Sequence, residues 1–313
     1  MSSALAVQPP PRPSLRGPFR LAIAMLVVTT ITILWGAMTT STGSGLVYRD
    51  WPPSDGQLMP ESSYTTVPGF LEHFHRVFGA LAGLLTISLA VWTQVRATAR
   101  GVRKLAWFAL ALIVVQGVVG GVGVLKGTPA LTSVAHGTLA QLTLATFACL
   151  AYQLSARYRA TPRVTTVRAG SGRKLVVFAV VVLVVQTVVG GVARHTNSPH
   201  ALWTHVGNAL VVFLVVAIAT AFASGRLGDT PGIKGLNRWL VLLLIAQIAL
   251  GFTALGIRNP AGKTPANVER LVPAAVISVH VLLGALLTVL TATLAAHVFR
   301  ATRAPDAAVE GVA

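Results

Sequence analysis

Eight long apolar segments constrain the fold of this chain more than any other feature of its sequence. A helix needs about 20 residues to cross the membrane hydrocarbon, and each segment reaches or approaches that length. Apolar residues run continuously rather than alternating with polar ones, which disfavours a membrane β-barrel. Charged residues make up only 11% of the chain, against about a quarter in soluble domains. We therefore predict an all-α polytopic membrane protein with spans near residues 21–40, 70–93, 105–125, 131–154, 175–193, 201–223, 239–256 and 272–297.

The basic residues predict how these spans are oriented. With the N-terminus inside, 18 Lys and Arg residues fall in inner segments and six in outer ones, while Arg76 lies within a span. The positive-inside rule then places both termini in the cytoplasm and the protein in the cell membrane. This topology explains the formal charge of +17. We therefore predict that the basic residues contact anionic lipid of the bilayer, and that the protein does not bind nucleic acid.

The ends of the chain and its single cysteine add three expectations. Residues 1–20 are expected to form a disordered cytoplasmic lead, and 301–313 a cytoplasmic tail. The first apolar segment is longer than a typical signal-peptide core, so we predict an uncleaved span, with a cleaved signal as the alternative. Cys149 lies within an apolar segment, which excludes a disulfide or a CxxC motif.

Three pairs of successive segments share a repeated pattern. In each, a helix with Gln-x-x-x-Gly is followed, after an outer loop, by a helix with a histidine near its outer end. Such repeats commonly place one binding site in each half of a membrane protein. We predict two related four-helix halves, residues 21–160 and 161–300, and a close-packing role for the glycines. The motifs are Gln116 and Gly120 before His136, Gln186 and Gly190 before His205, and Gln247 and Gly251 before His280; Gly36 before His75 matches without the glutamine.

Histidines inside membrane spans are costly and are usually functional or hydrogen-bonded between helices. Four at equivalent places in a repeat favour a shared function. Zinc is disfavoured because these histidines lack the HExxH spacing and the set of cysteine or carboxylate ligands that zinc sites usually have. A di-iron site needs several inward carboxylates, whereas Glu72 is the only acid in a span. Paired imidazoles suit haem iron, so we predict one haem-type site in each half, using His75, His136, His205 and His280.

The two predicted sites are not equivalent. Glu72 and Arg76 flank His75, while no ionisable residue lies beside His205 or His280. Two interpretations stay open: the two charges pair with each other across one helical turn, or Arg76 binds a haem propionate and Glu72 faces the macrocycle. The other histidines are given minor roles: His73 is secondary, and His195, His200 and His297 are expected to be polar surface residues.

With these motifs in place, the chain resembles the haem A synthase family, membrane enzymes that convert haem O to haem A. The resemblance runs from about residue 20 to 298. Because the weak Glu-x-x-His-Arg motif occurs together with eight spans and three further histidines, the combination is specific. The residues that carry it are Thr42-Gly43-Ser44-Gly45-Leu46, Asp50-Trp51-Pro52, Glu72-x-x-His75-Arg76, His136 with Gly137 and Gln141, His205 and His280.

The resemblance implies a reaction and a set of roles. His75 and His136 would hold the substrate haem O, and His205 and His280 a haem b that passes electrons. The methyl group at position 8 of the macrocycle would be oxidised through an alcohol to a formyl group. Glu72 would be the essential carboxylate, as a general base or as a stabiliser of positive charge. The implied partners are haem O synthase and a terminal oxidase, and a homo-oligomer is left open.

The sequence departs from the family in its outer loops. Many members carry a cysteine pair before the Asp-Trp-Pro element, whereas Val47-Tyr48-Arg49 stands here. A thiol-based electron route or loop crosslink is therefore absent, as in a cysteine-free class of the family, and the electron donor is left open.

Three other functions compete with this interpretation. A di-haem b-type electron carrier explains the four histidines but not why Glu72 and Arg76 flank only one pair. A haem or small-molecule transporter would fit the repeat, but no matching pair of proline-broken helices is present. A purely structural subunit leaves the buried histidines unexplained.

Overall fold

The computed structural model describes residues 14–96, 98–257 and 268–305, without the side chains of residues 268–270. Eight of its helices are long and apolar enough to cross a membrane. The all-α polytopic prediction is therefore confirmed, with one short pair of parallel strands added. The elements are α1 (Arg16–Ser41), α2 (Ser62–Thr65), α3 (Val67–Val95), α4 (Arg100–Leu125), α5 (Ala130–Leu154), α6 (Ala156–Ala160), β1 (Val164–Thr165), α7 (Ala169–Thr196), α8 (Pro199–Leu227), α9 (Ile233–Gly256), α10 (Val268–Ala301) and β2 (Thr302–Arg303).

The long helices extend past the predicted apolar cores. α7 begins at Ala169 rather than 175, and α10 ends at Ala301 rather than 297. The helical hydrogen-bond pattern continues beyond the hydrocarbon, where basic side chains reach the aqueous boundary. The predicted lead was too long, because residues 16–20 belong to α1. Residues 1–13 of that lead, and 306–313 of the tail, lie outside the described residues.

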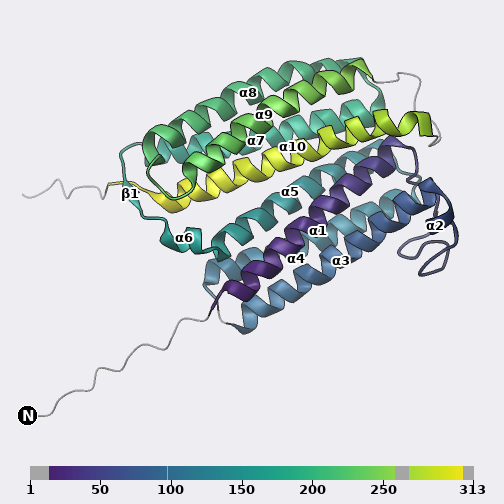
Figure 1. Ribbon diagram of the computed structural model, residues 1–313, viewed down its shortest axis with the longest axis horizontal. Coiled ribbons are helices and arrows are strands. Elements are labelled where there is room, and N and C mark those ends of the chain that lie inside the picture. Colours follow the sequence, from purple (N-terminus) through teal and green to yellow (C-terminus); the bar gives the residue numbers. More distant parts are fainter. Residues whose placement is uncertain (1–13, 97, 258–267, 306–313) are drawn as a thin grey trace, which may run out of the picture.

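The long helices pack as two sets of four. α1, α3, α4 and α5 contact one another in a ring, and α7, α8, α9 and α10 do the same. Each set has its own cluster of buried apolar side chains. α1, α5, α7 and α10 form the junction between the sets, where Ile33, Leu144 and Ala285 are buried together. Figure 1 shows the two sets side by side along the length of the molecule.

Caps and turns explain where the helices that carry the histidines begin. Thr66 caps α3 by accepting a hydrogen bond at its Oγ1 from Gly69 N (3.2 Å), and Ser198 caps α8 in the same way with Ala201 N (3.2 Å). A proline follows each cap, a position where its missing N–H costs nothing. α3, α5, α8 and α10 all begin at the end of the molecule that carries α2, while α6 and β1 lie at the opposite end (Figure 1). We call these the α2 end and the β1 end.

His297 is buried, which corrects the surface prediction made for it. Its side chain is 2% exposed. Nδ1 lies 2.8 Å from the Tyr152 hydroxyl, and Nε2 lies 2.9 Å from Thr230 Oγ1. These contacts join α10, α5 and the α8–α9 connection near the β1 end. The pattern of apolar residues could not reveal this, because the partners come from distant parts of the chain.

We expect His297→Ala to lower the free energy of unfolding by about 2–4 kcal/mol, since it opens a cavity and leaves two buried hydroxyl groups without their partner. Thermal unfolding of the detergent-solubilised protein measures the effect. His200 is exposed, so His200→Ala is the matched control and should change stability by less than about 0.5 kcal/mol. Equal melting temperatures for both variants would contradict a structural role for His297.

Candidate functional site: two histidine pairs

The four predicted histidines meet as two pairs of nearly identical geometry. His75 of α3 and His136 of α5 have ring centroids 6.2 Å apart and ring planes at 82°. His205 of α8 and His280 of α10 have centroids 6.3 Å apart and planes at 83°. Each pair therefore comes from two helices that begin at the α2 end, and each helix set holds one pair. We call them the first pair and the second pair.

A backbone carbonyl of the preceding long helix positions three of these imidazoles. His75 Nδ1 lies 3.0 Å from Thr32 O, His136 Nδ1 lies 3.2 Å from Gln116 O, and His205 Nδ1 lies 3.2 Å from Gln186 O. A carbonyl only accepts, so Nδ1 carries the proton and Nε2 keeps its lone pair. Metal-ligating histidines are commonly oriented in this way.

A glycine one turn after each carbonyl makes room for the ring. A Cβ placed on Gly36, Gly120 or Gly190 would lie 2.6–2.7 Å from Cε1 of the histidine in its pair of helices. On Gly251 it would lie 3.0 Å from His280 Cε1. The glycines therefore do allow close packing, as the repeat predicted, and the group they pack against is the imidazole.

Sequence reasoning missed the hydrogen-bond partners of these three histidines because each partner is a main-chain atom. The glutamine of the repeat marks the carbonyl, yet Thr32 serves equally well in α1. This explains why the first copy of the repeat lacks the glutamine. The amide groups of Gln116 and Gln247 lie 3.4 Å from Nε2 of His136 and His280. Gln186 instead donates to His205 O (2.9 Å).

The donor set fits a metal-centred macrocycle. Imidazole nitrogens lie about 2 Å from a bound metal, so two rings on one metal have centroids about 6 Å apart once the ring radii are added. Both pairs have this separation. Within the described residues, His280 Nδ1 and the side-chain oxygens of Gln116 and Gln247 are buried without a hydrogen-bond partner. Buried polar atoms are normally satisfied, which is consistent with sites completed by a ligand.

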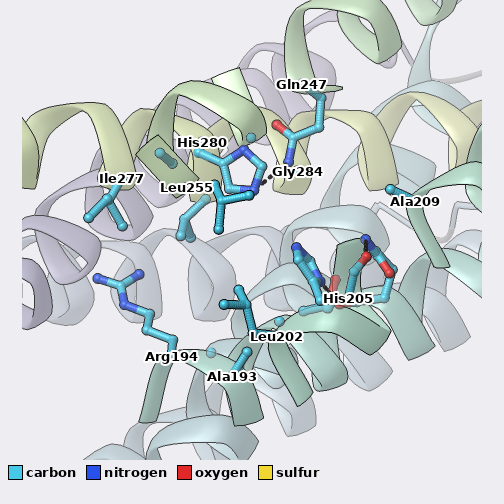
Figure 2. A pocket seen from close by; sticks show the side chains of 18 of the residues that line it. Ala193, Arg194, Leu202, His205, Ala209, Gln247, Leu255, Ile277, His280 and Gly284 are labelled. Atoms are coloured by element: carbon cyan, nitrogen blue, oxygen red, sulfur yellow. Dashed lines mark hydrogen bonds between the residues drawn. The ribbon is translucent and has the colours of Figure 1, made fainter. Parts of the chain in front are cut away.

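A cavity of about 550 Å³ opens at the second pair. That volume is within the range of about 300–1,000 Å³ typical of sites for small molecules and cofactors. Figure 2 shows His205 and His280 on opposite sides of the cavity, with Gln247 close to His280. The lining is mainly apolar and includes Gly190, Gly191, Gly251 and Gly284, which suits a flat hydrophobic ligand.

The cavity also reaches the first helix set. Gly137, Thr138 and Gln141 of α5 line it, although the neighbouring His136 belongs to the first pair. Gln141 Oε1 accepts a hydrogen bond from Thr187 Oγ1 of α7 (3.0 Å). One helix, α5, therefore carries His136 of the first pair and also contributes Gly137, Thr138 and Gln141 to the wall of the cavity at the second pair.

Glu72 and Arg76 pair with each other, as one of the two open interpretations held. Arg76 Nη2 lies 2.7 Å from Glu72 Oε1, and Glu72 is 3% exposed. Glu72 Oε2 accepts from the N–H groups of Val47 (2.7 Å) and Tyr48 (3.2 Å). The carboxylate lies one turn before His75 and is held by three donors.

Arg76 also holds the loop between α1 and α2. Nη1 donates to Asp50 O (2.8 Å) and to Pro53 O, and Nη2 donates to Tyr48 O (2.9 Å) as well as to Glu72. All four N–H groups on these two nitrogens are thus engaged. The propionate contact of Arg76 stays a prediction, and in this structure the Nη1 and Nη2 groups are occupied by the loop and by Glu72.

The Asp-Trp-Pro element closes the same loop. Asp50 accepts from Gly56 N (2.7 Å) and Asp55 N (2.9 Å), and these N–H groups hold the pKa of its carboxyl below the usual range. A Cβ on Gly121 of α4 would lie 2.4 Å from the Trp51 ring. The indole therefore packs on Gly121, the residue that follows the glycine accommodating His136.

The remaining histidines differ from their predicted roles in part. His73 is 4% exposed, and its Nδ1 lies 3.0 Å from Ser54 Oγ, so it supports the loop. His195 belongs to α7 rather than to a loop and lines the cavity, which corrects the surface prediction. His200 is exposed, as predicted. Arg194, counted only as an outer charge from the sequence, also lines the cavity.

Comparisons with known proteins identify the family of this chain. A family model described as cytochrome oxidase assembly protein matches residues 19–299. A haem A synthase from Symbiobacterium thermophilum is 28% identical over 260 residues, covering 74% of this chain and 83% of the relative. One from Bacillus licheniformis is 24% identical over 269 residues, covering 75% and 86%. One from Roseobacter denitrificans is 32% identical over 130 residues, covering 38% and 34%. Since the family model covers nearly the whole chain, the protein belongs to the haem A synthase family of cytochrome oxidase assembly proteins.

Proposed function

We propose that the protein is an oxidoreductase that converts haem O to haem A by oxidising the C8 methyl group of the macrocycle, through an alcohol, to a formyl group. The observation that carries this proposal is the asymmetry of two otherwise equivalent histidine pairs. Both have the separation of paired metal ligands, but the Glu72–Arg76 ion pair lies one helical turn from the first pair only. Family membership supports the same reaction.

In the first site, His75 and His136 bind the substrate iron. Their Nδ1 protons are committed to Thr32 O and Gln116 O, so both rings present Nε2. The Gln116 amide lies 3.4 Å from His136 Nε2, the nitrogen that would bind the iron. The loop held by Arg76, with Trp51 packed on α4, limits access of water from the α2 end.

Glu72 acts as a fixed negative charge near the reacting carbon. Three hydrogen bonds hold its carboxylate in place: Oε1 accepts from Arg76, and Oε2 accepts from the N–H groups of Val47 and Tyr48. Because both oxygens already accept hydrogen bonds from fixed donors, stabilisation of developing positive charge fits better than proton abstraction, of the two roles left open by the sequence. A preorganised charge in a water-poor site acts most strongly because solvent does not screen it.

The second site is proposed to hold haem b between His205 and His280. When bound, haem b supplies a one-electron acceptor for the oxidation. The residues of this chain fix its position: His205 is locked by Gln186 O, and Gly190 and Gly251 leave space for the rings. α5 forms the wall between the two sites, through His136 on one side and Gly137 and Gln141 on the other, which keeps the electron path short.

The proposed setting is the cell membrane, with both termini in the cytoplasm and the four histidines toward the outer face. The support is the excess of basic residues on the side of the termini and the position of His136 and His205, each the seventh residue of a helix that begins at the α2 end. Haem O synthase and a terminal oxidase are the proposed partners before and after the reaction.

Acid extraction and chromatography of the bound haems, after expression with a source of haem O, test the proposal directly. We expect haem B together with haem O, its alcohol form or haem A. Haem B alone, at two per chain, would instead support the di-haem electron carrier. Absence of any haem from folded protein would contradict the role of both histidine pairs.

Substitutions at Glu72 separate charge from loop anchoring. We expect Glu72→Gln to keep bound haem and the main-chain hydrogen bonds to the loop, because the amide oxygen can still accept from the Val47 and Tyr48 N–H groups although the NH2 group cannot accept from Arg76. Haem A formation should fall at least about a hundredfold, a magnitude typical for loss of one preorganised electrostatic group. Glu72→Ala should lose the activity and loosen the loop as well, measured by proteolysis between residues 47 and 57. Unchanged haem A output from Glu72→Gln would rule out the charge-stabilising role.

Two glycines one turn apart on α4 provide a matched pair for the packing argument. Gly120→Ala places a methyl group against His136 and should lower the haem O content of the first site, since the ring must shift away from Gln116 O. A Cβ on Gly117 meets no atom within 4 Å, so Gly117→Ala should leave haem content unchanged. The absorption spectrum and extracted haem per chain measure both. Equal haem content in the two variants would refute the packing argument.

A further inference from the structure

Arg194 is a cation in the wall of the second cavity, and the proposed function gives it no role. It lies in the last turn of α7 and lines the cavity with His205 and His280. Figure 2 shows its side chain extending from α7 toward Ile277 of α10, on the side of the cavity where Leu202 lies. No carboxylate among the described residues pairs with it, because the ion pair present there joins Glu72 to Arg76. A charge inside a membrane protein is costly without a partner.

The guanidinium is held in place but only partly used. Nη2 donates to Ala37 O (2.9 Å) and to Ser41 Oγ (2.7 Å), both on α1. Ser41 Oγ lies 3.1 Å from Ser278 Oγ of α10, so three helices fix the position of the charge. Because these bonds use Nη2, the N–H groups on Nη1 and Nε are not engaged by them.

The internal repeat shows that this cation is particular to α7. The residue four positions after the histidine-packing glycine is Thr40 in α1, Val124 in α4 and Leu255 in α9, but Arg194 in α7. Thr40 and Leu255 line the same cavity. The packing of the repeated helices therefore does not need a charge at this position. A ligand bound at the second site can explain why α7 has an arginine there.

We propose that Arg194 binds a propionate carboxylate of the haem b held by His205 and His280, and thereby fixes the rotation of the macrocycle about the axis through the two histidines. This inference rests on the proposed function. The propionates are the anionic groups of haem, and a guanidinium pairs with a carboxylate through parallel hydrogen bonds. In a cavity lined mainly by apolar groups this pair is weakly screened, so it contributes to both affinity and orientation.

Haem B and its dimethyl ester, which lacks the propionate charges, are the probes that test this inference. They are titrated into haem-free, detergent-solubilised full-length protein carrying His136→Ala, which leaves one complete histidine pair. We expect haem B to bind about ten- to a hundredfold more tightly than the ester, the range expected for charge-assisted hydrogen bonds. Arg194→Met should remove most of this preference, and Arg194→Lys should keep part of it. Lys126→Met, which removes an exposed cation at the same end, should keep all of it.

The reduction potential of the bound haem is a second measurement, because a change in side-chain packing alone would not shift this potential in a predictable direction. A nearby cation favours the reduced haem, so Arg194→Met should shift the potential to more negative values, while Lys126→Met should not. Equal binding of haem B and its ester by the His136→Ala protein, or equal weakening of both by Arg194→Met, would overturn the inference alone. Failure of that protein to bind haem B would overturn the proposed second site and this inference with it.

Discussion

The contact between a histidine Nδ1 and a backbone carbonyl, made across a glycine, is the interaction on which both sites depend. The carbonyl belongs to a helix that is already hydrogen-bonded, so it is a rigid acceptor. The glycine lets the imidazole approach it, and the bond fixes the proton on Nδ1. Nε2 then keeps its lone pair, and the ring centroids of the two pairs are 6.2 and 6.3 Å apart. Repetition of one local arrangement thus gives two histidine pairs of nearly the same geometry in one chain.

The junction between the two helix sets connects these sites. α5 carries His136 and also forms part of the wall of the second cavity, and its Gln141 accepts a hydrogen bond from Thr187 of α7. α1 contributes Thr32 to the first pair and holds Arg194 of the second site. A substitution at the junction would therefore affect both sites, because the helices are shared rather than merely adjacent.

The loop between α1 and α2 is held by charge and main-chain hydrogen bonds in a chain whose loops have no cysteine. Arg76 donates to three loop carbonyls, and Glu72 accepts from two loop N–H groups. The same ion pair lies beside the first pair of histidines. Anchoring the loop and placing a fixed negative charge are consequently one structural feature, and this explains how a buried Glu72 and Arg76 are tolerated in a membrane span.

The sequence alone determined the helical class, the eight spans, the repeat and the four histidines, because hydrophobic length and residue spacing are local properties. It also identified Glu72 and Arg76 as a distinctive pair without deciding between their two interpretations. Only the tertiary structure showed that they pair, that His297 is buried, and that Arg194 lines a cavity. Those facts depend on contacts between residues far apart in the chain, several of them to main-chain atoms, which no side-chain pattern encodes.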